Sequence, residues 1–201
     1  MGKDAIAASR IIGGVETAVN EFPWVVRLSY FNKFYCGGML INDRTVLTAA
    51  HCVKGLMWFM IRVTLGEHNR CNDTRRPETR FVVEYKAHNF SYSDFRHDIA
   101  VLKLNERVNI TNSVKPVCLP TDDGLYYEKL SSQVNAIATG WGSMSEQTKN
   151  HSCKLLEVEV PILSNEECRN TKYEAAMISD GMMCAGFPDK GGKDTCQVMK
   201  L

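Results

Sequence analysis

The chain has 201 residues, of which 44% are hydrophobic and 23% are charged, and its formal net charge is +1 at pH 7. This composition is that of a globular protein and excludes a disordered chain. The small net charge, without any block of like charges, provides no basic surface for nucleic acid or for an anionic membrane. No apolar run approaches the length of about 18 residues that a membrane-spanning helix needs.

Short apolar or alternating runs, rich in β-branched residues and separated by turn residues, recur along the chain. Such runs predict the short strands of an all-β sandwich or barrel. The runs expected to form strands are 24–30, 38–41, 60–65, 81–85, 99–104, 134–139 and 155–160. The segment 114–121 is expected to be an extended crossing between two halves. Ser164 is followed by Glu167 three residues later, a capping box that predicts one short helix.

Eight cysteines stand at irregular spacings, without a C-x-x-C pair or a Cys/His cluster at ligand spacing. They predict disulfides in an oxidising compartment rather than a zinc site. Sequons for N-glycosylation point to the same compartment and lie at Asn72, Asn89, Asn109 and Asn150. We therefore expect a secreted, extracellular glycoprotein. Because residues 1–10 hold no apolar signal core, we expect translation to start upstream of Met1.

Two residues suggest hydrolytic chemistry. His51 stands among small residues and directly before Cys52, so a disulfide could staple the turn that holds its imidazole. Asp98 precedes the apolar run 99–104, which is expected to be a buried strand. An imidazole and a buried carboxylate are two of the three members of a hydrolytic triad. The third member would be a nucleophilic serine in a glycine-rich turn.

Five motifs, in this order, resemble those of the trypsin-like (chymotrypsin-fold) serine proteases. They lie at 10–14, 48–52, 98–102, 139–142 and 194–197. The resemblance implies an all-β fold of two antiparallel β-barrels, with the site in the cleft between them. It also implies an activation cleavage between Arg10 and Ile11. Residues 1–10 would then be the remnant of a pro-segment, and residues 11–201 the protease domain.

The same resemblance implies a role for each matching residue. His51 would be the general base, and Asp98 would hold its tautomer and stabilise the imidazolium. Asp194 corresponds to the carboxylate at the base of the family's specificity pocket, which pairs with Arg or Lys of the substrate. The expected partners are therefore proteins or peptides containing Arg or Lys, together with protease inhibitors.

The sequence departs from the family after Gln197. The family continues with Gly-Asp-Ser-Gly-Gly-Pro, whereas residues 198–201 read Val-Met-Lys-Leu. We therefore expect a C-terminally truncated chain with an incomplete second barrel, no nucleophilic serine and no oxyanion hole. The glycine-adjacent Ser143 and Ser145 do not match the nucleophile motif. The chain as given is expected to be inactive.

An alternative is a non-catalytic pseudoprotease or interaction protein. Such a protein has no need of His51, Asp98 and Asp194, and all three are present. Their retention favours a shortened form of an active enzyme.

The resemblance also implies two disulfides, Cys36–Cys52 and Cys168–Cys184. Cys71 and Cys153 are not general family positions, but the fold places their loops side by side, so we expect them to bond. Cys196 would pair with a cysteine outside this sequence. Cys118 resembles the cysteine that tethers an upstream pro-domain.

Glu67 begins a loop that binds a structural calcium in some relatives. Thr74 and Pro77 stand where further carboxylates are required, while Asp73 and Glu78 are each one position away. Oxygen ligands are thus present but out of register for calcium. The sequence therefore favours a chain without a metal or other cofactor, with a structural calcium in this loop as the alternative.

Overall fold

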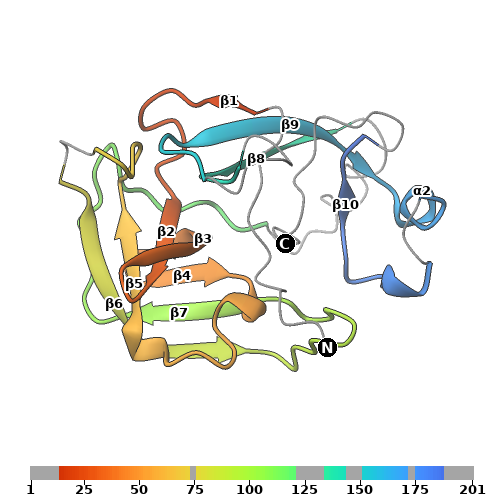
Figure 1. Ribbon diagram of the computed structural model, residues 1–201, viewed down its shortest axis with the longest axis horizontal. Helices are drawn as coiled ribbons and strands as arrows, with labels where there is room; N and C mark the ends of the chain where they lie inside the picture. Colours follow the sequence, from red (N-terminus) through yellow and green to blue (C-terminus); the bar gives the residue numbers. More distant parts are fainter. Residues whose placement is uncertain (1–13, 73–75, 121–133, 144–150, 172–174, 188–201) are drawn as a thin grey trace.

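The computed structural model describes residues 14–72, 76–120, 134–143, 151–171 and 175–187, and these residues form two β units joined side by side (Figure 1). The first unit is a closed six-stranded antiparallel barrel in the order β2-β3-β4-β7-β6-β5. Its strands are β2 (Val25–Tyr30), β3 (Lys33–Asn42), β4 (Thr45–Thr48), β5 (Ile61–Leu65), β6 (Glu78–Ala87) and β7 (Ala100–Leu104).

Alternation along the barrel strands builds the core of this unit. Every second residue of a strand points to the same face, so a strand in a closed barrel sends alternate side chains inward. The inward-facing side chains include Val26, Leu28, Leu40, Val46, Val63, Leu102 and Leu104, all at most 1% exposed. Gly38 is required where β3 and β4 approach closely, because a Cβ atom there would lie 2.8 Å from the Leu47 carbonyl oxygen.

The second unit is a sheet centred on β9 (Leu156–Leu163). Among the described residues, β9 pairs with β1 (Val15–Glu16), β8 (Asn135–Gly140) and β10 (Cys184–Ala185), all antiparallel. Its small core comprises Leu156, Val158 and Val160, packed against alanines of β8 and β10. The described part of the chain therefore shows one complete barrel and a partly formed second one, as expected for this fold class.

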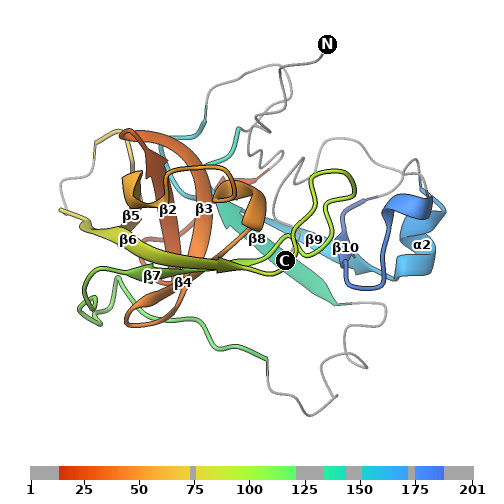
Figure 2. The same ribbon diagram turned by 90° about the horizontal axis from the view of Figure 1, so that it is seen from below.

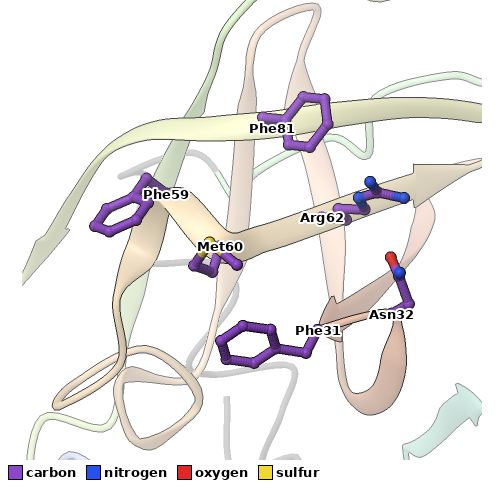
Figure 3. Close-up of a pocket in the computed structure, with 6 residues that line it drawn as sticks. All are labelled: Phe31, Asn32, Phe59, Met60, Arg62 and Phe81. Carbon is purple, nitrogen blue, oxygen red and sulfur yellow. The ribbon is translucent and has the colours of Figure 1, made fainter.

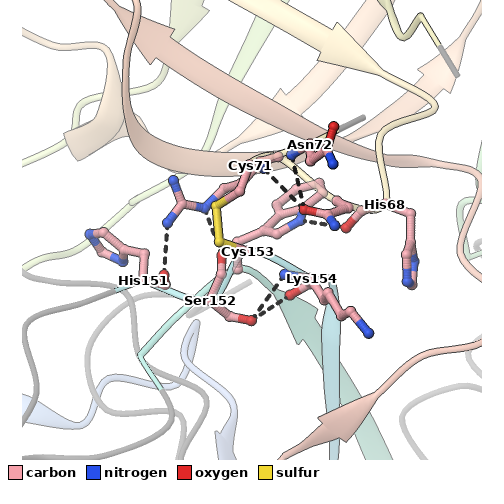
Figure 4. The surroundings of a disulfide bond; sticks show 10 residues. His68, Cys71, Asn72, His151, Ser152, Cys153 and Lys154 are labelled. Atoms are coloured by element: carbon pink, nitrogen blue, oxygen red, sulfur yellow. Dashed lines mark hydrogen bonds between the residues drawn. A yellow bond between two sulfur atoms is a disulfide. The ribbon is translucent and has the colours of Figure 1, made fainter. Parts of the chain in front are cut away.

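Three features join the two units. A cluster of Val25, Trp141 and Leu155 packs between them, and the Trp141 Nε1–H donates to the His68 carbonyl oxygen at 3.1 Å. The disulfide Cys71–Cys153 crosses the same junction (Figure 4). Figures 1 and 2 show the second sheet beside the barrel, with β10 and the helix α2 (Asn165–Arg169) at the end farthest from it.

The helix α2 has the predicted capping box. Ser164 Oγ accepts from the Glu167 backbone N–H at 3.1 Å, and the Glu167 carboxylate accepts from the Ser164 backbone N–H at 2.8 Å. The other helical elements are the 3₁₀ turns η1 (Ala50–Cys52), η2 (Trp58–Met60) and η3 (Ala175–Met177). No helix in the described ranges has the length and apolarity to cross a membrane.

The predicted strands all occur, whereas β1, β4 and β10 were not among them. Of the predicted strands, 38–41 differs most in its bounds, because it is part of the longer β3. Phe31 and Asn32 both have positive φ angles, 48° and 65°, between the paired residues Tyr30 and Lys33. Two such residues make the tight turn whose twist matches a two-residue hairpin. This turn extends β3 back to Lys33, and the alternation in 33–37 is too weak to predict it.

Candidate active site

His51 is held in the 3₁₀ turn η1, directly after β4. Ala50 is fully buried, so the turn packs tightly on the barrel. The disulfide Cys36–Cys52 ties the residue after His51 to β3, and the Tyr35 hydroxyl donates to the Cys52 carbonyl oxygen at 2.9 Å. These contacts fix both the backbone and the position of the imidazole.

Asp98 stands in the turn that leads into β7. His97 has a φ of 55°, and the Ile99 N–H donates to the His97 carbonyl oxygen at 2.7 Å. The pairing of Thr48 in β4 with Ala100 in β7 then brings this turn next to η1. Register across two neighbouring barrel strands therefore places Asp98 beside His51.

The Asp98 carboxylate accepts two hydrogen bonds from His51. Its Oδ2 lies 2.6 Å from Nδ1 of the ring, and its Oδ1 accepts from the His51 backbone N–H at 2.8 Å. The two side chains are only 15% and 8% exposed. A carboxylate at Nδ1 favours the tautomer that carries its proton there, which leaves the lone pair on Nε2 available to act as a base.

An aromatic side chain of the 88–97 segment lies beside the site. The ring of Phe90, which is buried, lies 6.5 Å from the His51 ring between centroids. Lys54 Nζ donates to the Phe90 carbonyl oxygen at 2.5 Å, and the Tyr92 hydroxyl donates to the Lys54 carbonyl oxygen at 2.7 Å. Burial and then the charge of Asp98 raise the pKa of Tyr92. The Asp98 carboxylate is thus close enough to act electrostatically on this segment.

Several predicted residues lie outside the described part of the chain: Arg10, Ile11, Asp194, Cys196, Asn150 and Ser145. Ser143 is described and is fully buried, so its hydroxyl does not face a substrate. The sequon residues Asn72, Asn89 and Asn109 are exposed. The structure therefore brings His51 and Asp98 together and leaves the other catalytic and specificity residues as predictions.

The three predicted disulfides are present: Cys36–Cys52, Cys71–Cys153 and Cys168–Cys184. Cys118 is exposed with a free thiol. The sulfur atoms of Cys36 and Cys52 also lie near His51, a grouping of metal-ligand types. Because these sulfurs are bonded to each other, they are not thiolate ligands, and the group is not a metal site.

In the described part of the loop that holds calcium in some relatives, two carboxylates have arginine partners. Both oxygens of the buried Glu67 carboxylate accept from the Arg27 guanidinium, one of them at 2.9 Å. Glu78 is paired with Arg80. A calcium site needs six to eight free oxygen ligands. Here the arginines supply positive charge at both carboxylates.

Arginines at this junction were not singled out by sequence reasoning. Arg70 donates to the carbonyl oxygens of His151 and Ser152 at 2.7 and 2.6 Å, which ties the Glu67 loop to the second unit. Burial and then the charge of Arg27 lower the pKa of Arg70. A signal existed for Arg27, since it stands between Val26 and Leu28 in an apolar strand. A charge in such a run needs a buried partner.

Comparison with known proteins agrees with this geometry. Residues 11–198 match the family model described as Trypsin. The chain is 34% identical to the venom serine protease Bi-VSP of Bombus ignitus, an alignment covering 98% of this chain and 57% of that protein. It is 36% identical to the proclotting enzyme of Tachypleus tridentatus (94% and 53%) and to kallikrein-1 of Mus musculus (94% and 72%).

A closed six-stranded barrel that carries a paired His and Asp beside a second β unit defines the class of trypsin-like serine proteases. This chain belongs to the trypsin family. It spans a little over half the length of the bumblebee and horseshoe-crab relatives, at 57% and 53%.

Proposed function

We propose that this domain belongs to a serine endopeptidase that cleaves proteins after Arg or Lys, with His51 as its general base. The observation that carries the proposal is the pair of hydrogen bonds from His51 to Asp98, at 2.6 and 2.8 Å. The bond to Nδ1 sets the tautomer of the His51 ring. The bond from the His51 backbone N–H fixes the position of the Asp98 carboxylate. This arrangement orients a base and serves no evident packing need.

The chemistry of the pair follows from its geometry. Nε2 of His51 accepts the proton of a serine hydroxyl as that oxygen attacks the substrate carbonyl. The ring becomes an imidazolium, and the adjacent Asp98 carboxylate stabilises its charge. His51 then returns the proton to the leaving amine, which restores the starting state.

The residues printed here do not contain the Gly-Asp-Ser-Gly-Gly-Pro motif that supplies the family's nucleophile. We infer that a polypeptide consisting of these 201 residues alone does not catalyse. An enzyme that loses one triad member still accelerates the reaction roughly 10³- to 10⁴-fold over water, and this remaining acceleration depends on an oxyanion hole. The same missing motif supplies the hole.

Specificity for basic residues rests on Asp194. By resemblance this carboxylate lies at the base of the substrate pocket, where a desolvated charge selects Arg or Lys. Substrates are therefore proteins or peptides with exposed Arg or Lys. Inhibitors that present such a residue in a rigid loop would compete for the same pocket.

We further propose that the protein is a secreted zymogen, activated by cleavage between Arg10 and Ile11. Three disulfides and three exposed sequon residues support an oxidising, extracellular compartment. The relatives include a venom protease and a proclotting enzyme. The exposed thiol of Cys118 is available to tether an upstream pro-domain after cleavage.

The test is to add the nucleophile motif to the C-terminal end of this chain by fusion. The C-terminal segment of mouse kallikrein-1, beginning at its nucleophile motif, is fused after Gln197, and the product is cleaved after Arg10. We expect hydrolysis of Arg and Lys esters but not of a Phe ester, abolished by His51→Ala. The 201-residue chain alone should hydrolyse none of them.

Two results would contradict the proposal. Turnover of an Arg ester by the 201-residue chain, lost on His51→Ala, would overturn the inference of inactivity. A fusion protein that prefers the Phe ester would overturn the specificity, and an Asp194→Ser variant that keeps its preference for Arg would do the same.

A further inference from the structure

The first barrel carries an apolar pocket on its outer surface, at the end of the β2–β3 hairpin. It is an open hollow of about 330 Å³, lined by Phe31, Asn32, Phe59, Met60, Arg62 and Phe81 (Figure 3). Its volume lies at the lower end of the roughly 300 to 1,000 Å³ typical of binding pockets. None of these residues belongs to the His51–Asp98 site.

Three phenylalanines of this pocket are about half exposed. Phe31, Phe59 and Phe81 are 56%, 54% and 43% exposed. Single exposed apolar side chains are ordinary, but several gathered around one hollow mark a surface for interaction. Phe31 is held with a positive φ of 48°, a conformation that is unfavourable for a bulky residue. The hairpin therefore presents its ring to solvent at a conformational cost.

Arg62 gives the pocket its charge. It lies opposite Phe81 across β5 and β6, and its guanidinium carbon is 5.3 Å from the centroid of that ring. Within the described part of the chain Arg62 forms no ion pair, and no carboxylate lines the pocket. Lys33, the residue after Asn32, is exposed and also lacks an ion pair among the described residues.

Three other arginines of the barrel have acidic partners. Arg80, Arg96 and Arg107 are paired with Glu78, Asp94 and Asp43 respectively. An arginine left unpaired beside exposed aromatic rings can bind a carboxylate of another molecule while its flat face stays on the ring. Arg44 and Arg76 also form no ion pair among the described residues, and Arg62 differs from both in lying against an exposed aromatic ring.

The closed barrel also restricts how a partner can bind. Both β5 and β6 have strand neighbours on each side, so neither offers a free edge to which an incoming strand could be added. Recognition at this face must therefore use side chains: an apolar group in the hollow and an anionic group on the arginine.

We propose that this pocket docks an acidic segment of a partner protein, with one aromatic or large aliphatic side chain inserted among Phe31, Phe59 and Phe81. A carboxylate next to that side chain pairs with Arg62. The pocket shares no residue with the His51–Asp98 site, and it would hold a substrate, inhibitor or regulator by a second contact.

Binding of a defined peptide to the full chain tests this proposal. The probe is a fluorescein-labelled peptide with one Phe flanked by two aspartates on each side, and the readout is fluorescence anisotropy. We expect saturable binding that weakens at least tenfold in Arg62→Glu and in Phe59→Ser. Lys86→Glu makes the same charge change on an exposed residue of β6 outside the pocket, and it should alter the affinity less than twofold.

Matched peptides separate the two contacts. Replacing the Phe by Ala should remove binding through the pocket, and replacing the aspartates by asparagines should remove the contribution of Arg62. Equal binding of all three peptides, equal losses in Arg62→Glu and Lys86→Glu, or no binding at millimolar peptide would each overturn the proposal. Self-association that Phe59→Ser abolishes would also overturn it, because the occupant would then be a second copy of this chain. Catalysis is not measured, so these outcomes are independent of the proposed protease activity.

Discussion

His51 Nδ1 and Asp98 Oδ2 lie 2.6 Å apart, although 47 positions separate the two residues in the sequence. The contact depends on the β4–β7 register, in which Thr48 faces Ala100. Since both strands belong to the closed barrel, the pair is assembled by a unit that is complete within the described residues. The geometry of the imidazole and the carboxylate is therefore set by two neighbouring strands of one unit.

The two hydrogen bonds to Asp98 predict a specific cost for Asp98→Asn. An asparagine amide has one oxygen, so one of the two N–H groups of His51 would face an NH₂ group and lose its acceptor. An unsatisfied buried donor costs about 1 to 3 kcal/mol. Urea unfolding should show this loss. The control Asp94→Asn weakens a partly exposed ion pair with Arg96 and should cost less than about 1 kcal/mol, and equal effects of the two substitutions would contradict the account.

The Arg27–Glu67 pair predicts a stability that does not depend on calcium. Arg27→Gln leaves the Glu67 carboxylate, whose side chain is 4% exposed, without its counter-ion. Breaking such a pair costs about 3 kcal/mol. The control Arg96→Gln breaks an exposed pair and should cost less than about 1 kcal/mol.

The melting temperature of the unmodified protein should be the same in EDTA and in calcium, and a rise of several degrees in calcium would contradict this.

The Cys71–Cys153 bond predicts how the two units are coupled. It closes a segment of 82 residues between the barrel and the second sheet. Restricting the unfolded chain over such a length contributes about 4 kcal/mol. Replacing both cysteines by serine should lower stability by this order and should separate thermal unfolding into two transitions. A single transition with unchanged midpoint would show that packing around Trp141 is sufficient to couple the units.

Tyr35 predicts a fall in stability at high pH. Burial raises the pKa of its phenol well above the ordinary value. Above about pH 10 the unfolded state therefore releases this proton while the folded state retains it, and stability decreases as pH rises. Tyr35→Phe should cost about 1 kcal/mol near pH 7, through loss of the bond to the Cys52 carbonyl. The substitution should also make the loss of stability above about pH 10 less steep. If stability falls with pH as steeply in Tyr35→Phe as in the unmodified protein, Tyr35 is not the cause.

Much of the fold was accessible from the sequence because the barrel strands alternate. Residues 25–30 and 100–104 carry inward apolar side chains at every second position, and this pattern is set by the pleat itself. The capping box at Ser164 is also local. In contrast, the start of β3 depends on Phe31 and Asn32 adopting positive φ angles, and Phe31 has no intrinsic preference for that conformation.

The candidate site was predictable only in part, for a related reason. His51 and Asp98 stand in distinctive motifs, so each could be recognised singly and then paired through the family resemblance. Arg27, Arg70 and the Phe81–Arg62 contact have no motif, because they depend on which strands become neighbours. Strand order in a barrel is a long-range property, and the residues that meet across it are visible only in the folded chain.

The central claim is that Asp98 holds His51 with its proton on Nδ1 and leaves Nε2 free as the base. Nitrogen-15 NMR of histidine-labelled protein at mildly alkaline pH measures this directly, with His51→Gln identifying the signals of this ring. We predict a neutral ring protonated at Nδ1, with a strongly downfield proton on that nitrogen. A ring protonated at Nε2, or one that averages between the two tautomers, would contradict the account.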